Sequence, residues 1–234
     1  MQDAVADVFV KLLDLDIEPV ALAFVEERPA GVEETDAVVP SSCTFWRHAE
    51  NRVFYAPAEK HFNCPIGAHV MGFDLPEGVQ AALGAAVGTM CEVNYISADE
   101  VPGIPQVRKP KRGIVYGRLG ELPIDPDVVL LWLTPRQAML FNEAADGARW
   151  GDEAGRSVFG RPACAAIPAA LEGGRPTMSI GCTGMRTFTE ILPDRMLAVV
   201  PWAGADELRR SLESIVESNK TMQDYYEEQK SLVA

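Results

Sequence analysis

The sequence contains no run of about 18 apolar residues, the length that a membrane-spanning helix needs. Residues 1–15 carry four charged side chains, among them Asp3 and Lys11, so they lack the basic start and apolar stretch of a secretory signal. These absences argue against a membrane partner. We therefore expect a cytoplasmic protein.

Positive charge is scarce. The 234 residues hold 34 acidic against 21 basic side chains, a net charge of -13, which would repel a phosphate backbone or an anionic membrane surface. Nucleic acid is therefore not an expected partner. The one basic cluster runs from Arg108 to Arg112, and it is either a solvated loop or a place for an anionic substrate group.

The sequence also lacks a Walker loop, a G-x-G-x-x-G turn, a G-x-S-x-G elbow, an H-E-x-x-H helix and any C-x-x-C pair. Its three histidines, His48, His61 and His69, are interleaved with Cys43 and Cys64, which suggests a mixed Cys/His metal site. Cysteine and histidine five positions apart point about 140° apart on a helix, so only His61 and Cys64 could converge.

Two short apolar runs, residues 19–25 and 127–133, have the pattern of strands covered on both faces. Each is followed by helix-forming residues, and cysteines follow in similar order: Cys64 and Cys91 in the first half, Cys164 and Cys182 in the second. We therefore expect an α/β or α+β fold of two similar strand-plus-helix halves, with an internal duplication as one explanation.

The halves comprise residues 1–101 and 127–234, packed as one globular unit. Between them, residues 102–126 contain five prolines and the basic cluster, which predicts a linker or crossover rather than a core element. Apolar stripes predict a first helix that ends before Pro19 and a last helix through Leu208 and Met222. The polar tail of that last helix, residues 224–230, is expected to fray.

The sequence has five cysteines, an odd number that cannot all pair, and a cytoplasmic protein is in a reducing compartment. We therefore expect free thiols or metal ligands rather than disulfides. Cys43 follows serines that can cap a helix, and Cys64 precedes Pro65 at a plausible first helical position. A helix N-terminus lowers a thiol pKa. Cys91, in an apolar and strand-like stretch, is expected in the core.

Cys182 lies between Gly181 and Gly184, which permit a tight turn whose N–H groups suit an anion or an iron–sulfur cluster. With Cys43, Cys64 and Cys164 it would complete the four thiolates that ligate such a cluster or, alternatively, a zinc ion. The leading hypothesis is a redox or substrate-activating metal protein, with a small-molecule substrate or a redox partner. Alternatively, the thiols are buried in the core as small apolar side chains and have no chemical function.

Two further hypotheses stay open. One is an enzyme that uses Cys64 or Cys182 as a low-pKa nucleophile, supported by Arg186 or a histidine. The other is a non-catalytic module that binds an anionic metabolite beside Arg186. Whether the chain is an enzyme at all, and whether it forms homo-oligomers, the sequence leaves open.

Four segments in combination are typical of one protein family: PVALAF, CTFWRHAE, CPIGAHVMGF and RPACAAIPAALEGGRPTMSIGCTGMR. They resemble the bacterial and archaeal family of domain of unknown function 169 (DUF169). The resemblance implies no reaction, but it strengthens the choice of the four cysteines, which we expect as metal ligands, and it adds a further set of residues, which we expect around the cofactor. That further set is Gly67, Ser179, Gly181, Gly184 and Arg186.

Overall fold

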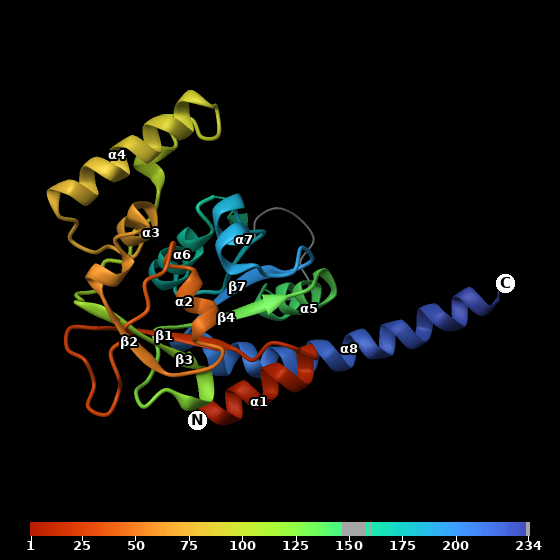
Figure 1. The fold of residues 1–234 in the computed structure, drawn as a ribbon. Helices are drawn as coiled ribbons and strands as arrows, with labels where there is room; N and C mark the ends of the chain where they lie inside the picture. Colours follow the sequence, from red (N-terminus) through yellow and green to blue (C-terminus); the bar gives the residue numbers. More distant parts are fainter. Residues whose placement is uncertain (147–157, 160, 233–234) are drawn as a thin grey trace.

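A sheet of seven strands runs through the centre of the computed structural model, which describes residues 1–146, 158–159 and 161–232 (Figure 1). The strand order is β2-β3-β1-β4-β7-β6-β5, antiparallel throughout except for the parallel pair β5–β6. The strands are β1 (Val20–Val25), β2 (Phe54–Pro57), β3 (Gly113–Arg118), β4 (Val128–Leu133), β5 (Val158–Phe159), β6 (Thr177–Ser179) and β7 (Met196–Pro201).

Helices cover both faces of this sheet, so the expected mixed α/β class is confirmed. The α-helices of the described residues are α1 (Gln2–Leu13), α2 (Thr44–His48), α3 (Pro65–Val70), α4 (Glu77–Glu92), α5 (Pro135–Asp146), α6 (Ala166–Gly173), α7 (Thr183–Thr189) and α8 (Ala205–Ser231). None of them is long and apolar enough to cross a membrane.

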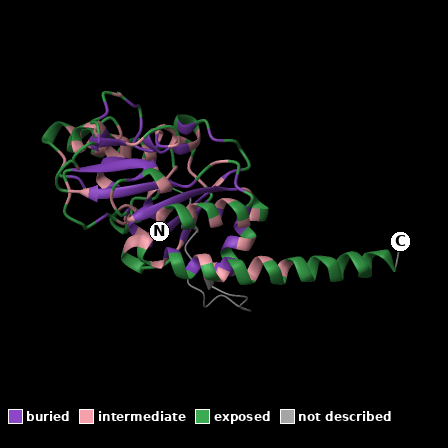
Figure 2. Cartoon of the chain, turned by 90° about the horizontal axis from the view of Figure 1, so that it is seen from below, coloured by how far each residue is buried: buried purple, intermediate pink, exposed green. Residues whose placement is uncertain are grey.

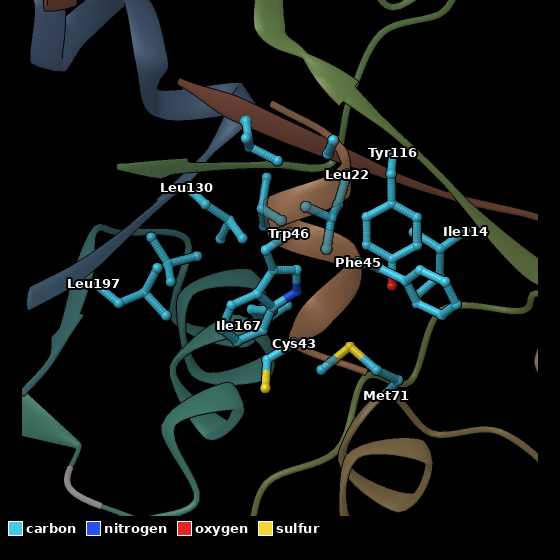
Figure 3. Close-up of a cluster of buried hydrophobic side chains, with 14 of the residues drawn as sticks. Leu22, Cys43, Phe45, Trp46, Met71, Ile114, Tyr116, Leu130, Ile167 and Leu197 are labelled. Atoms are coloured by element: carbon cyan, nitrogen blue, oxygen red, sulfur yellow. The ribbon is translucent and has the colours of Figure 1, made fainter. Parts of the chain in front are cut away.

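The apolar runs became strands because both of their faces are buried. In β1, Leu22 and Phe24 point into one core, while Ala21 and Ala23 point into the other. Helices α1, α5 and α8 pack on the second face, and α2, α3, α6 and α7 lie on the first (Figure 1). Figure 3 shows the first core, with Cys43 at its border.

Six of the seven strands are arranged symmetrically about the pair β1–β4. Next to this pair lie β3 and β7, and outside these lie β2 and β6, while β5 at the edge has no counterpart; β3 itself belongs to the segment between the two expected halves. Under this match Cys43 corresponds to Cys164, and Cys64 corresponds to Cys182. That pairing differs from the one expected from the order of the cysteines along the chain, and the duplication itself stays a prediction.

The expectation of a linker is wrong for part of residues 102–126. This range contains β3, which is buried along nearly its whole length and pairs with both β1 and β2. The prolines flank the strand and leave the run from Gly113 to Arg118 free of them, so its N–H groups can enter both ladders.

Two other local expectations also differ from the structure. Cys91 lies within α4, of which no residue is buried, and not in a core strand. The tail of α8 stays helical to Ser231 and extends away from the body with exposed side chains (Figure 2). Its helix-favouring residues and ion pairs such as Lys230–Glu227 support that last part locally.

Candidate functional site

The four cysteines singled out from the sequence line one cavity of about 1000 Å³. They reach it from four segments: the turns before α2, α3 and α7, and the 3-10 turn Ala163–Ala165 before α6. Cys91 is absent from the lining. The fold therefore brings together thiols that are up to 139 positions apart in the chain, and it leaves the fifth one out.

Cys64 and Cys182 are held in the same way. Each is the N-cap residue of its helix, and each sulfur accepts a hydrogen bond from a backbone N–H three residues later. The distances are 3.3 Å from Gly67 N and 3.4 Å from Met185 N. A sulfur in this position faces the free backbone N–H groups at the start of a helix.

Cys43 joins the site through Ser41. The Ser41 hydroxyl lies 3.0 Å from the Cys43 sulfur and donates a hydrogen bond to the Cys64 sulfur at 3.5 Å. The two sulfurs therefore cannot be farther apart than the sum of these distances. Thr44, at the start of α2, donates to the carbonyl of Phe188 in α7 at 3.2 Å and so connects the first half to the second.

The thiols act on each other electrostatically. Burial raises the pKa of Cys43 from 9.0 to about 12, and the neighbouring sulfurs of Cys64 and Cys182 add to this effect. Burial also raises the pKa of Cys164 well above its ordinary value, with further contributions from the other three sulfurs. Without a bound cation, Cys43 and Cys164 are therefore neutral thiols at physiological pH.

The histidines do not join these thiols as one set. His61 is 1% exposed, and its ring bonds to Pro57 O at 3.0 Å and to the Tyr116 hydroxyl at 2.9 Å. Burial lowers its pKa to about 4. His69 lines the cavity, where a side-chain nitrogen of Gln106 lies 2.9 Å from its ring, whereas His48 does not line it. The expected convergence of His61 with Cys64 is therefore not found, because the ring is used in the core.

Gly67 and Gly184, two of the five residues assigned to the cofactor surroundings, line the cavity. The other three shape the loop before Cys182. The Ser179 hydroxyl accepts from Gly181 N at 3.0 Å, and Gly181 has φ +88, a conformation that favours glycine. A Cβ there would also lie 2.4 Å from Met185 Cε.

Arg186 holds the same loop. Its guanidinium donates to three carbonyls, those of Ile180 at 2.5 Å, Pro193 at 3.2 Å and Arg195 at 3.0 Å. This side chain is not among those that line the cavity, so the geometry gives it a structural part. In the basic cluster, Lys109 pairs with Asp127 at 2.7 Å.

The sequence did not predict that Ser41, Ser42 and helix α4 line the cavity. The sequence suggests that a serine caps α2, but no side chain does so, because Ser41 bonds to sulfur instead. Leu83, Val87 and Met90 of α4 form the wall opposite the thiols. Their helical spacing was the available signal.

Within the described ranges, no group of three or more His, Cys, Asp or Glu side chains is arranged so that it could hold a metal ion. The thiols surround the same cavity, but they do not form a closed ligand set for one ion.

Comparison with known proteins gives relatives without a stated activity. The DUF169 family, described as "Uncharacterised ArCR", matches residues 8–210. The "Uncharacterized protein MJ0308" of Methanocaldococcus jannaschii is 27% identical over 184 residues, which cover 75% of this chain and 77% of that protein. No solved structure matches the chain.

Proposed function

This chain belongs to the DUF169 family, and we propose that it holds an iron–sulfur cluster in the thiol pocket, with a redox or substrate-activating role. The observation that carries this proposal is that Cys43, Cys64, Cys164 and Cys182 line one cavity from four separate segments. Four cysteine thiolates are the usual ligands of such a cluster.

A thiophilic cation would change the protonation of the pocket. Cys43 and Cys164 have raised pKa values because burial and the neighbouring sulfurs oppose their ionisation. Bound iron would reverse that effect, since a coordinated thiol loses its proton outright. The backbone N–H groups that already point at Cys64 and Cys182 would stabilise the negative sulfurs of the bound form.

A cluster and a single zinc ion place different demands on the four thiols. Four sulfurs on one zinc must each lie about 2.3 Å from the same point. In a cubane cluster each thiolate binds a different iron, so the four sulfurs stand farther apart. Zinc remains the alternative occupant.

The rest of the cavity has room for an organic molecule. Apolar side chains such as Ile66, Leu83 and Ile104 form much of its wall, and the total volume of about 1000 Å³ exceeds what a cluster needs. An apolar wall beside a cluster excludes water and influences its reduction potential.

Anaerobic reconstitution with iron and sulfide tests this proposal. We expect visible absorption and bound iron with acid-labile sulfide in the wild-type chain, and loss of most of both in Cys64→Ser and Cys182→Ser. Cys91→Ser is the matched control, because this thiol does not line the cavity and its loss should change nothing. Protein that takes up no iron, or a Cys91→Ser variant as impaired as the other two, would overturn the proposal; stoichiometric zinc in its place would support the alternative.

A further inference from the structure

Ser42 is a buried polar residue at the thiol site. It stands between Ser41 and Cys43 in the turn before α2, is 4% exposed and lines the cavity. Its carbonyl accepts a hydrogen bond from Phe45 N at 3.2 Å, which fixes the backbone of the turn. The backbone position of Ser42 beside the thiols is therefore set by the fold.

The Ser42 hydroxyl has no hydrogen-bond partner among the residues that the structure describes. Native proteins leave few buried polar atoms in this state, because an unpaired hydroxyl away from water is costly. The neighbouring Ser41 shows the contrast, since its hydroxyl lies within hydrogen-bond distance of both Cys43 and Cys64. The turn thus holds one serine that is satisfied by the thiols and one that is not.

Gly67 shows where the free hydroxyl lies. A Cβ on this glycine would stand 2.9 Å from the Ser42 hydroxyl oxygen and also 2.9 Å from the Cys64 sulfur. Both atoms therefore flank the same bare Cα at the cavity wall. A group bound by Cys64 would lie close to the Ser42 hydroxyl.

We propose that Ser42 is a positioning residue that donates a hydrogen bond to a sulfur of the bound cluster, either a sulfide or the Cys64 thiolate. This inference rests on the proposed function. Reduction adds negative charge to the sulfurs, so a hydroxyl donor stabilises the reduced form more than the oxidised form. Ser42 therefore raises the reduction potential of the cluster.

The test compares Ser42→Ala with Ser41→Ala in the empty and the loaded protein. In the empty chain, Ser42→Ala should unfold at the same or a higher urea concentration, because it removes an unsatisfied hydroxyl, whereas Ser41→Ala should unfold at a lower one. In the loaded chain, Ser42→Ala should keep its iron content and show a lower reduction potential in a redox titration. Ser42→Thr, which keeps the hydroxyl, should bring the potential back toward that of the wild type.

Each outcome separates the two proposals. A loaded Ser42→Ala protein with an unchanged potential overturns the role of Ser42 and leaves the cluster in place. An empty Ser42→Ala chain that loses as much stability as Ser41→Ala shows that the hydroxyl has a partner in the protein itself, which also overturns the inference. A wild-type chain that takes up no cluster overturns both proposals.

Discussion

The two halves of the thiol site present their cysteines in the same way but surround them differently. Cys64 and Cys182 both cap a helix with sulfur, and each accepts the N–H of the third residue that follows. In the first half this third residue is Gly67, pressed against sulfur and Ser42; in the second half it is Met185, a buried side chain. The backbone geometry is thus the same in both halves, whereas the side chains packed around the sulfur differ.

The largest effect is expected in the second half, from Met185→Ala. Met185 is 2% exposed, and shortening it leaves a cavity next to Gly181, so the free energy of unfolding should fall by about 2–5 kcal/mol. Urea unfolding measures this change. Met222→Ala is the control, because Met222 is 43% exposed and its loss should cost about 0.5 kcal/mol or less. Equal losses in the two variants would contradict the assigned packing.

A smaller effect should separate the two glycines. A Cβ at Gly67 would crowd the Cys64 sulfur and Ser42, so Gly67→Ala should lower the free energy of unfolding by about 1–3 kcal/mol. At Gly184 a Cβ meets only Phe188 at 3.8 Å, an ordinary contact, so Gly184→Ala should be neutral or stabilising by about 1 kcal/mol. If Gly67→Ala were as stable as Gly184→Ala, the crowding in the first half would be refuted.

The effect that is smallest at neutral pH, and that grows only as the pH rises, is shared by both halves. The pKa of Cys43 is 9.0 for an ordinary thiol and about 12 in the fold, so its contribution to stability is complete below pH 9 and is lost as pH rises toward 12. The slope is at most about 1.4 kcal/mol per pH unit.

Urea unfolding at increasing pH checks this dependence on the metal-free protein. Cys43→Ala should flatten the alkaline decline, and a double variant with Cys164→Ala should flatten it further, because the pKa of Cys164 is also raised. If stability fell as steeply with pH in the double variant as in the wild type, groups other than these two thiols would cause the alkaline decline.

Local sequence signals predicted much of the fold. The continuous apolar runs became β1 and β4, the first helix ended before Pro19, and Cys64 stands at a helix start with Pro65 as the first helical residue. These predictions succeeded because capping, periodicity and proline geometry act within a few residues. β3 was missed because prolines and basic residues surround a short run whose partners are 92 and 60 positions away, counted from Val115 to Ala23 and from Val115 to Tyr55.

The sequence by itself placed Cys43 and Cys64 at helix starts and Cys182 on a glycine turn, and it separated Cys91 from the other four. Only the tertiary structure decided that those four cysteines line one cavity. It also decided that Arg186 donates hydrogen bonds to backbone carbonyls and that His61 bonds to Tyr116 in the core. Of the two serines beside Cys43, it left only Ser42 with a hydroxyl that has no partner among the described residues. The physical reason is the distance along the chain over which each kind of interaction acts. A cap or a strand is decided by near neighbours in the chain, whereas the partner of a side chain depends on how the sheet brings distant segments together.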